Sequence, residues 1–150
     1  AGNSRKQALE QELGAQYRSL EQLLAEADRP GVVVPLSEAT RKLIGARELR
    51  LMKPSAFLIN IARGPVVDEA ALIEALQAGT IRGAGLDVYE HEPLAESPLF
   101  KLPNALTLPH IGSATAETRE AMANRALDNL RSALLGERPR DLVNPQVWKG

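Results

Sequence analysis

The sequence has 150 residues, the length of one ordinary domain, and it is 44% hydrophobic but only 3% aromatic, so we expect a buried core that is aliphatic. Its net charge of −1 offers no basic surface for nucleic acid or an anionic membrane, and no apolar run approaches the ~20 residues that a membrane span requires. It contains no cysteine, which excludes a disulfide framework and thiol chemistry, and we expect a soluble, cytoplasmic protein.

The first part of the chain is predicted to be helical. Residues 4–15 predict a helix that is capped at Ser4. Ser19 and Gln22 have the spacing of a capping box, in which each side chain bonds the backbone N–H of the other residue. This pair indicates a second helix over residues 20–27.

A short strand and more helix follow. The three valines at 32–34 predict a buried strand, which Pro30 in the turn-like entry makes short or frayed because proline donates no ladder hydrogen bond. Ser37 is expected to cap one turn of helix. A further helix near residues 46–52 is stopped by Pro54.

The middle of the chain predicts a strand, a helix and a second strand. Residues 56–61 have the apolar character of a buried strand. Asp68 is placed to cap a helix over residues 69–78, and Gly79 is placed to close it. The next strand, residues 84–88, follows within a few residues. Such short links imply a right-handed crossover and a parallel pair of strands.

The last part predicts a loop, a strand and a long helix. Residues 89–103 contain three prolines and no periodicity, which is typical of a loop, and residues 105–108 form a strand. The cluster at 113–115 can cap a helix over residues 116–135, which Gly136 ends. An apolar stripe on this helix consists of Met122, Ala126, Leu127, Leu130 and Leu134. The fold class is therefore α/β: a partial Rossmann-like, doubly wound parallel sheet with flanking helices and a long C-terminal helix.

Three of the predicted strands end at polar or charged side chains. Arg63 follows the strand at 56–61, Asp87 lies near the end of the next strand, and His110 follows the last one. Ligands of open parallel sheets bind outside the carboxyl ends of the strands, where the loops converge. The spacing therefore predicts one site assembled from three loops.

These residue types suit the reduction of a 2-keto acid by a nicotinamide. The guanidinium of Arg63 matches a carboxylate, and His110 is a natural general acid/base. Glu92, bonded to one ring nitrogen of His110, would fix the tautomer and keep a proton available. Each residue also has a purely structural interpretation: a salt bridge for Arg63, a strand-end cap for His110 and a solvated loop carboxylate for Glu92. His91 is interpreted as a solvated loop residue.

Three separated motifs carry a family resemblance. INIARGPVVDEAALIEAL, GAGLDVYEHEP and LPHIGSAT, in this order, resemble the C-terminal half of the D-isomer-specific 2-hydroxyacid dehydrogenases. HIGSATAETR and DNLRSALLGERPRDLVNP are most similar to the bacterial glyoxylate/hydroxypyruvate reductase (2-ketogluconate reductase) branch of that family. The resemblance covers nearly the whole chain. It implies NAD(P)H-dependent reduction of glyoxylate, hydroxypyruvate or 2-ketogluconate to a D-2-hydroxy acid.

The resemblance also implies roles for particular residues. The substrate-binding arginine of the family falls on Arg63, its orienting glutamate on Glu92 and its acid/base histidine on His110. Its cofactor contacts fall on Pro35, Ile61, Ala62, Arg63, Gly112, Ser113 and, for the nicotinamide amide, Asp87.

The opening segment bears on the cofactor. GNSRK resembles the loop after the second Rossmann strand, where the adenosine ribose is recognised, and a 2′-phosphate there attracts Arg and Lys. Ser4, Arg5 and Lys6, with no acidic residue before Glu10, therefore favour NADPH, and NAD stays open.

The sequence also departs from the family. It contains neither a G-x-G-x-x-G turn nor the separate substrate-binding domain, and by the resemblance both precede Ala1. We therefore expect residues 1–150 to be the second half of the NAD(P)-binding domain plus a C-terminal helix and tail, with little activity alone. The resemblance implies a homodimer for the full-length parent. The alternative is a non-catalytic α/β remnant that binds a nucleotide or a protein partner.

Overall fold

The computed structural model describes residues 6–148 of the chain. It consists of two compact units, Ala1–His110 and Ile111–Gly150. The first unit holds the sheet, and the second holds one long helix and the C-terminal tail. Among the described residues, no helix combines the length and the apolar character that crossing a bilayer would require.

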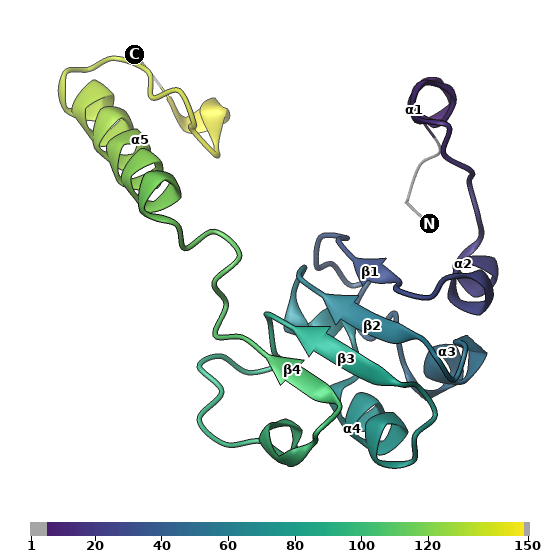
Figure 1. Ribbon diagram of the computed structural model, residues 1–150. Coiled ribbons are helices and arrows are strands. Elements are labelled where there is room, and N and C mark those ends of the chain that lie inside the picture. The colour runs from purple at the N-terminus through teal and green to yellow at the C-terminus, as the bar shows by residue number, and fades with distance from the viewer. Residues whose placement is uncertain (1–5, 149–150) are drawn as a thin grey trace. The chain divides into compact units, whose positions relative to one another are not determined.

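The first unit is built on a parallel sheet of four strands (Figure 1). In sheet order these are β1 (Gly31–Val32), β2 (Phe57–Asn60), β3 (Gly83–Leu86) and β4 (Ala105–Thr107). Asn60 pairs with Leu86 and Leu86 with Thr107, so β2, β3 and β4 end level with one another. The predicted α/β fold with a parallel sheet is confirmed.

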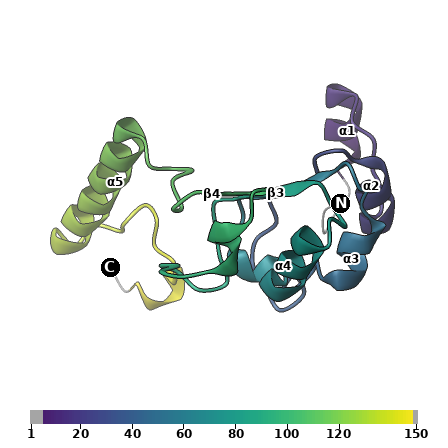
Figure 2. The ribbon, with the colours of Figure 1, turned by 60° about the horizontal axis from the view of Figure 1, so that its bottom comes forward.

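Three helices of the first unit carry most of its helical structure. They are α2 (Leu20–Glu26), α3 (Ala46–Leu51) and α4 (Glu69–Gln77), and Figure 2 shows α3 and α4 on the same face of the sheet. The core between the layers is aliphatic, as the composition predicts, and its most buried large side chains are Leu24, Leu49, Leu58, Leu72, Ile81 and Leu99.

The caps predicted at Ser19, Asp68 and Gly79 are confirmed, whereas the segment after Ser37 forms a hydrogen-bonded turn and not a helix. The Ser19 hydroxyl accepts the Gln22 N–H at 3.2 Å, and the Gln22 side chain accepts the Ser19 N–H at 3.0 Å, which completes the capping box of α2. The Asp68 carboxylate accepts the Ala71 N–H at the start of α4. Gly79 closes α4 with a φ of 68°, a left-handed conformation that glycine adopts without strain.

The first predicted strand is shifted. Expected at 32–34, it lies at Gly31–Val32, and Val33 is 71% exposed. The Pro30 carbonyl accepts the Ile59 N–H at 3.0 Å, and the Asp28 carbonyl accepts the Phe57 N–H at 2.9 Å. Proline lacks only the backbone N–H donor, so the Pro30 carbonyl can still pair with β2. The strand therefore lies closer to the N-terminus than predicted.

Two smaller differences concern the ends of the first unit. Helix α1 (Gln7–Leu13) begins at Gln7, with Lys6 at the cap position and no side-chain hydrogen bond there, whereas the predicted cap Ser4 lies outside the described residues. The loop after β3 contains a short 3₁₀ turn, Pro98–Lys101, which begins where the Ser97 hydroxyl accepts the Leu99 N–H. The sequence analysis did not predict this turn, because the prolines of the segment indicated a loop.

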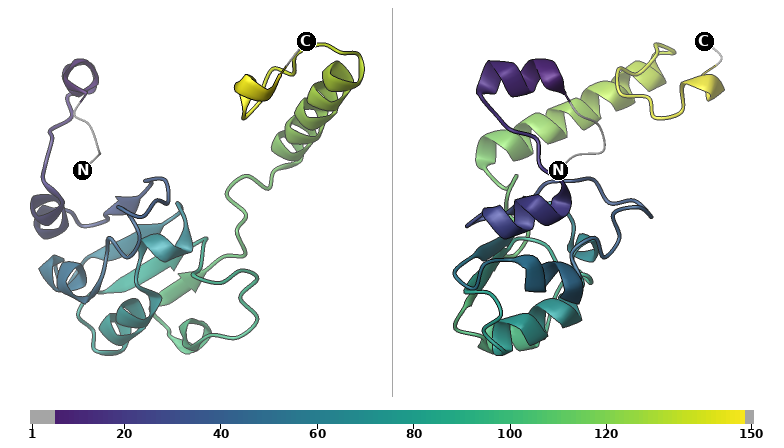
Figure 3. Two further views of the ribbon diagram at one scale, coloured as in Figure 1. Left: turned by 180° about the vertical axis from the view of Figure 1, so that it is seen from behind. Right: turned by 90° about the vertical axis from the view of Figure 1, so that its right-hand side faces the viewer.

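The second unit is organised around α5 (Ala116–Leu134), one continuous helix in both views of Figure 3. The Thr115 hydroxyl accepts the Thr118 N–H at its start, and Gly136 follows its end with a φ of 75°. The tail is tied to this helix where Asn129 exchanges two hydrogen bonds with Asp141. No residue of α5 is buried, so its predicted apolar stripe is exposed.

Candidate active site

The carboxyl edge of the sheet brings together the side chains that the sequence singles out. Arg63 follows β2, Asp87 comes directly after β3, and His110 follows β4. Since the three strands are parallel and end level, the loops that carry these residues leave the sheet at one edge.

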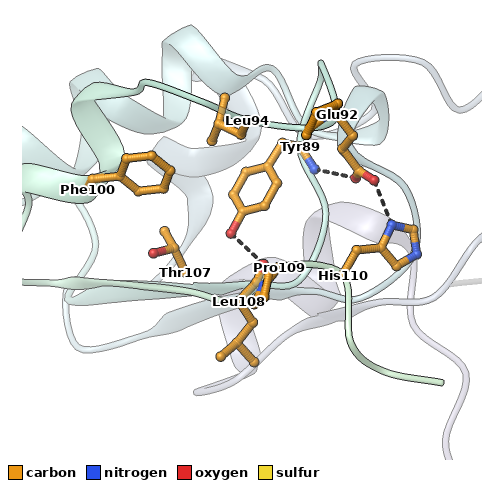
Figure 4. Close-up of a pocket in the computed structure, with 9 residues that line it drawn as sticks. Tyr89, Glu92, Leu94, Phe100, Thr107, Leu108, Pro109 and His110 are labelled. Atoms are coloured by element: carbon orange, nitrogen blue, oxygen red, sulfur yellow. Dashed lines mark hydrogen bonds and ion pairs between the residues drawn. The ribbon is translucent and has the colours of Figure 1, made fainter. Parts of the chain in front are cut away.

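Glu92 and His110 form a close pair (Figure 4). His110 Nδ1 lies 2.6 Å from Glu92 Oε2, and Glu92 Oε1 accepts the Tyr89 backbone N–H at 2.9 Å. Burial raises the pKa of Glu92, but the hydrogen bonds from His110 and Tyr89 and the charge of Arg63 bring that pKa below its usual value. Glu92 is therefore an ionised acceptor near neutral pH, which places a proton on Nδ1 of His110 and leaves Nε2 for a ligand.

His110 has an uncommon backbone conformation. Its φ is 53°, in the left-handed region that non-glycine residues seldom enter, although histidine enters it more often than most. The side chain stays 42% exposed, so packing alone does not hold the imidazole. Such conformations persist only where the surroundings fix them, and they concentrate at functional sites.

Arg63 presents its guanidinium at the same edge. Its Nη1 donates to the Ala62 carbonyl at 2.6 Å, and its positive charge is one of the causes that lower the pKa of Glu92. The charge of Arg63 thus favours the ionised form of Glu92.

The loop that carries Arg63 is shaped by Asn60, a residue that sequence reasoning missed. The Asn60 side chain is 1% exposed, accepts the Ala62 N–H at 3.1 Å and donates to the Arg63 carbonyl at 3.2 Å. A single amide at the end of the apolar segment AFLINI was the available signal. Asn60 also accepts the backbone N–H of Asp87 on its own carbonyl, and Asp87 is 6% exposed.

Four of the predicted cofactor residues line one hollow. Pro35, Ile61, Ala62 and Arg63 surround it together with Val33, Val34 and Leu36, at the carboxyl ends of β1 and β2. Val33 is 71% and Ile61 58% exposed, so the hollow offers apolar side chains that a flat heterocyclic ring could cover. These residues fit a nicotinamide dinucleotide.

The other predicted cofactor residues lie in other parts of the sequence, and Asp87 directly follows β3. Lys6 is exposed before α1, and Ser4 and Arg5 lie outside the described residues. Gly112 and Ser113 belong to the second unit, in the segment before α5. Within residues 6–148 there is no group of three or more His, Asp or Glu side chains arranged to hold a metal ion.

A second cavity, of about 460 Å³, opens beside the Glu92 and His110 pair. Its walls are mainly apolar, and Figure 4 shows the ring of Tyr89 between Leu94, Phe100 and the end of β4. The Tyr89 hydroxyl donates to the Leu108 carbonyl at 2.7 Å. The cavity therefore places a small apolar space directly against the polar pair.

The comparisons with known proteins identify a family. Residues 1–112 match the model of the D-isomer specific 2-hydroxyacid dehydrogenase NAD-binding domain. The chain is 56% identical, over 97% of its length, to a glyoxylate/hydroxypyruvate reductase B of Klebsiella pneumoniae.

Two solved structures are similar in fold and sequence. An NADPH-dependent glyoxylate/hydroxypyruvate reductase of Sinorhizobium meliloti, in complex with NADP and malonate, matches with a TM-score of 0.76 and 43% identity over 81% of the chain and 38% of that structure. A D-isomer specific 2-hydroxyacid dehydrogenase of Lactobacillus delbrueckii, in its NAD-complexed form, matches with a TM-score of 0.82 and 34% identity over 95% of the chain and 47% of that structure. The chain spans 46% of the length of the Klebsiella relative.

Proposed function

The chain belongs to the D-isomer specific 2-hydroxyacid dehydrogenase family, and from this premise we propose that it supplies the acid/base residues and part of the NAD(P) site of a reductase of small 2-keto acids. Glyoxylate, hydroxypyruvate and 2-ketogluconate are the proposed substrates, and D-2-hydroxy acids the products. The observation that carries the proposal is the 2.6 Å contact between His110 and Glu92 at the carboxyl edge of the parallel sheet.

Each residue has a distinct task in the proposed reaction. Arg63 binds the substrate carboxylate through its planar fork of donors. His110 gives a proton from Nε2 to the carbonyl oxygen as that oxygen gains negative charge, while Glu92 holds Nδ1 and stabilises the cationic imidazole. When bound, a reduced nicotinamide supplies the hydride to the carbonyl carbon.

The cofactor contacts follow the same proposal. Pro35, Ile61 and Ala62 would cover apolar parts of the dinucleotide, and Asp87 would accept from the nicotinamide amide. Gly112 and Ser113 would contact it from the segment beyond His110. Both an NADP and an NAD complex occur among the similar structures, so the family alone leaves the choice open.

The proposal is tested by replacing His110. In the complete polypeptide, His110→Ala should lower kcat for NADPH oxidation with glyoxylate or hydroxypyruvate by about 10²- to 10⁴-fold, the range of general acid/base catalysis, and change cofactor affinity little. His91→Ala is the matched control, because His91 is the other histidine of the chain and is exposed one residue before Glu92. Near-normal turnover in His110→Ala would refute the acid/base role.

NADPH is the proposed cofactor because Arg5 and Lys6 are the cations of the opening segment. Replacing both by Ala should raise the KM for NADPH and spare that for NADH. Equal effects on the two cofactors would remove the proposed contact with the 2′-phosphate.

A further inference from the structure

Tyr89 occupies an unusual place relative to the candidate active site. It is the aromatic member of a buried cluster that is otherwise aliphatic in the described part of the chain, and it is 7% exposed. It lies shortly after β3, between the strand that leads to Asp87 and the loop that carries Glu92. Neither its residue type nor its spacing marked it in the sequence.

The two polar ends of Tyr89 reach Glu92 and the segment that precedes His110. Its backbone N–H donates to Glu92 Oε1 at 2.9 Å. Its hydroxyl donates to the Leu108 carbonyl at 2.7 Å, two residues before His110, and lies 3.3 Å from the Leu86 carbonyl. Figure 4 shows the bond to Glu92 and the bond to the Leu108 carbonyl on opposite sides of Tyr89. Tyr89 thus links the Glu92 loop to the chain that delivers His110.

The backbone of Tyr89 also meets the loop that carries Arg63. A Cβ added at Gly64 would lie 1.8 Å from the Tyr89 carbonyl carbon and oxygen. Only glycine therefore allows these two backbone segments to come so close. Three segments that are distant in sequence therefore converge on this tyrosine: the one with Arg63, the one with Glu92 and the one with His110.

From these contacts we infer that Tyr89 is a positioning residue of the active site, whose hydroxyl fixes the imidazole of His110 against Glu92 by anchoring the Leu108 carbonyl. The inference rests on the proposed function for its catalytic consequence, and on geometry alone for the structural one. His110 needs such an anchor because its side chain is 42% exposed and its φ is 53°. Burial raises the pKa of the Tyr89 hydroxyl above its usual value, so the hydroxyl remains a donor at neutral and mildly alkaline pH.

The first test reads the pair directly and needs no activity. The chain contains two histidines, so ¹⁵N-histidine labelling resolves His110 and His91 separately. The His110 Nδ1–H proton, bonded to a carboxylate, should resonate far downfield in the unchanged chain. Tyr89→Phe, which keeps the ring and removes the hydroxyl, should move it upfield or broaden it by exchange with water, while His91 stays unchanged.

Controls separate positioning from simple loss of stability. Tyr17→Phe removes the hydroxyl of the other tyrosine, which is 44% exposed, and should leave the His110 resonance in place. If Tyr89→Phe loses the native amide spectrum, difluorotyrosine at position 89 keeps the ring and carries a more acidic phenol than tyrosine, and it should displace the resonance as that phenol titrates. An unchanged His110 resonance in a folded variant lacking the hydroxyl donor overturns the inference.

The second test measures the reaction. In the complete polypeptide, Tyr89→Phe should lower kcat about ten- to a hundredfold, the cost of a displaced catalytic group, with the KM for the 2-keto acid nearly unchanged. If the unchanged polypeptide has no reductase activity and Tyr89→Phe still displaces the His110 resonance, the proposed function is refuted and the positioning role stands. Full activity with an unperturbed resonance in Tyr89→Phe would refute the positioning role and leave the function standing.

Discussion

At the scale of single residues, the candidate site depends on how one carboxylate is held. Glu92 is partly buried, which raises its pKa, yet hydrogen bonds from His110 and Tyr89 and the nearby charge of Arg63 lower that pKa on balance. A carboxyl group with a lower pKa when folded binds fewer protons in the folded state than in the unfolded state. Its contribution to stability is therefore complete above the pKa of the unfolded chain, and it is lost as the pH falls through the lower folded pKa.

The lowered pKa of Glu92 gives a prediction for Glu92→Gln. The variant should lose part of the rise in free energy of unfolding that the unchanged chain shows as the pH increases through the region of about 3 to 5, because the unfolded pKa of Glu is near 4.3. Urea denaturation at a series of pH values measures this rise. Glu96→Gln is a suitable control, since Glu96 is an exposed carboxylate of the same loop. Parallel pH profiles for the unchanged chain and Glu92→Gln would show that Glu92 is not held as an ion.

Asn60 gives a second prediction at this scale. Its side chain bonds both the Ala62 N–H and the Arg63 carbonyl from a buried position, so Asn60→Ala leaves both groups without that partner. We expect the free energy of unfolding to fall by about 1–3 kcal/mol, the cost of unsatisfied buried groups. Asn104→Ala, which removes one bond to the Leu76 carbonyl from a half-buried site, should cost less in the same denaturation experiment. Equal losses would contradict a special role for Asn60.

Sequence reasoning found the charged residues of the site and missed the neutral ones that hold them. Arg63 and His110 attract attention because an ionisable group at the end of an apolar strand needs a reason. Tyr89 and Asn60 are held by hydrogen bonds to backbone groups, and the partner of the Tyr89 hydroxyl is 19 positions away at Leu108. No local pattern encodes the contact between Tyr89 and Leu108, so only the fold reveals it, whereas the side chain of Asn60 bonds groups two and three residues away.

At the scale of elements, local signals located helices better than strand registers. Caps such as the Ser19 and Gln22 pair act over three residues, and they appear as predicted. The register of β1 depends instead on β2, which is more than twenty residues further along the chain, and the Pro30 carbonyl joined that ladder although its nitrogen has no proton. The valines at 32–34 correctly indicated a strand, but the strand lies at Gly31–Val32.

The junction between the Arg63 loop and the segment after β3 gives a prediction at this scale. A side chain at Gly64 would overlap the Tyr89 backbone, which cannot yield as the end of a flexible side chain could. Gly64→Ala should therefore lower the free energy of unfolding by about 3 kcal/mol, the upper part of the usual cost of overpacking. Gly31→Ala is the control, because a Cβ there meets nothing within 4 Å, and it should change stability by less than about 0.5 kcal/mol. Similar urea midpoints for the two variants would contradict the close approach.

At the scale of the whole molecule, the sequence predicted the parallel α/β sheet because its signals are long and repeated. Apolar strands alternate with capped helices over short links, and few other topologies satisfy that order. The long helix was also predicted within one residue of its observed end, since Thr115 and Gly136 mark its two ends. What the pattern could not tell is where the apolar stripe of α5 packs, because periodicity identifies a face and not its partner.

The uneven burial of the chain predicts uneven local stability. The strands β2 and β3 lie inside the sheet and contain Leu58 and Leu86, at 0% and 4% exposure, whereas α5 has no buried residue. Most of the stability of a helix in a protein comes from the packing of its apolar face, and no residue of α5 is buried. In hydrogen exchange on the 150-residue chain, the amides of β2 and β3 should therefore exchange orders of magnitude more slowly than those of α5. Asn129→Ala, which removes the two hydrogen bonds of Asn129 with Asp141, should speed exchange at the end of α5 and leave β2 unchanged. Protection in α5 equal to that in β2 would mean that the exposed stripe is covered in solution.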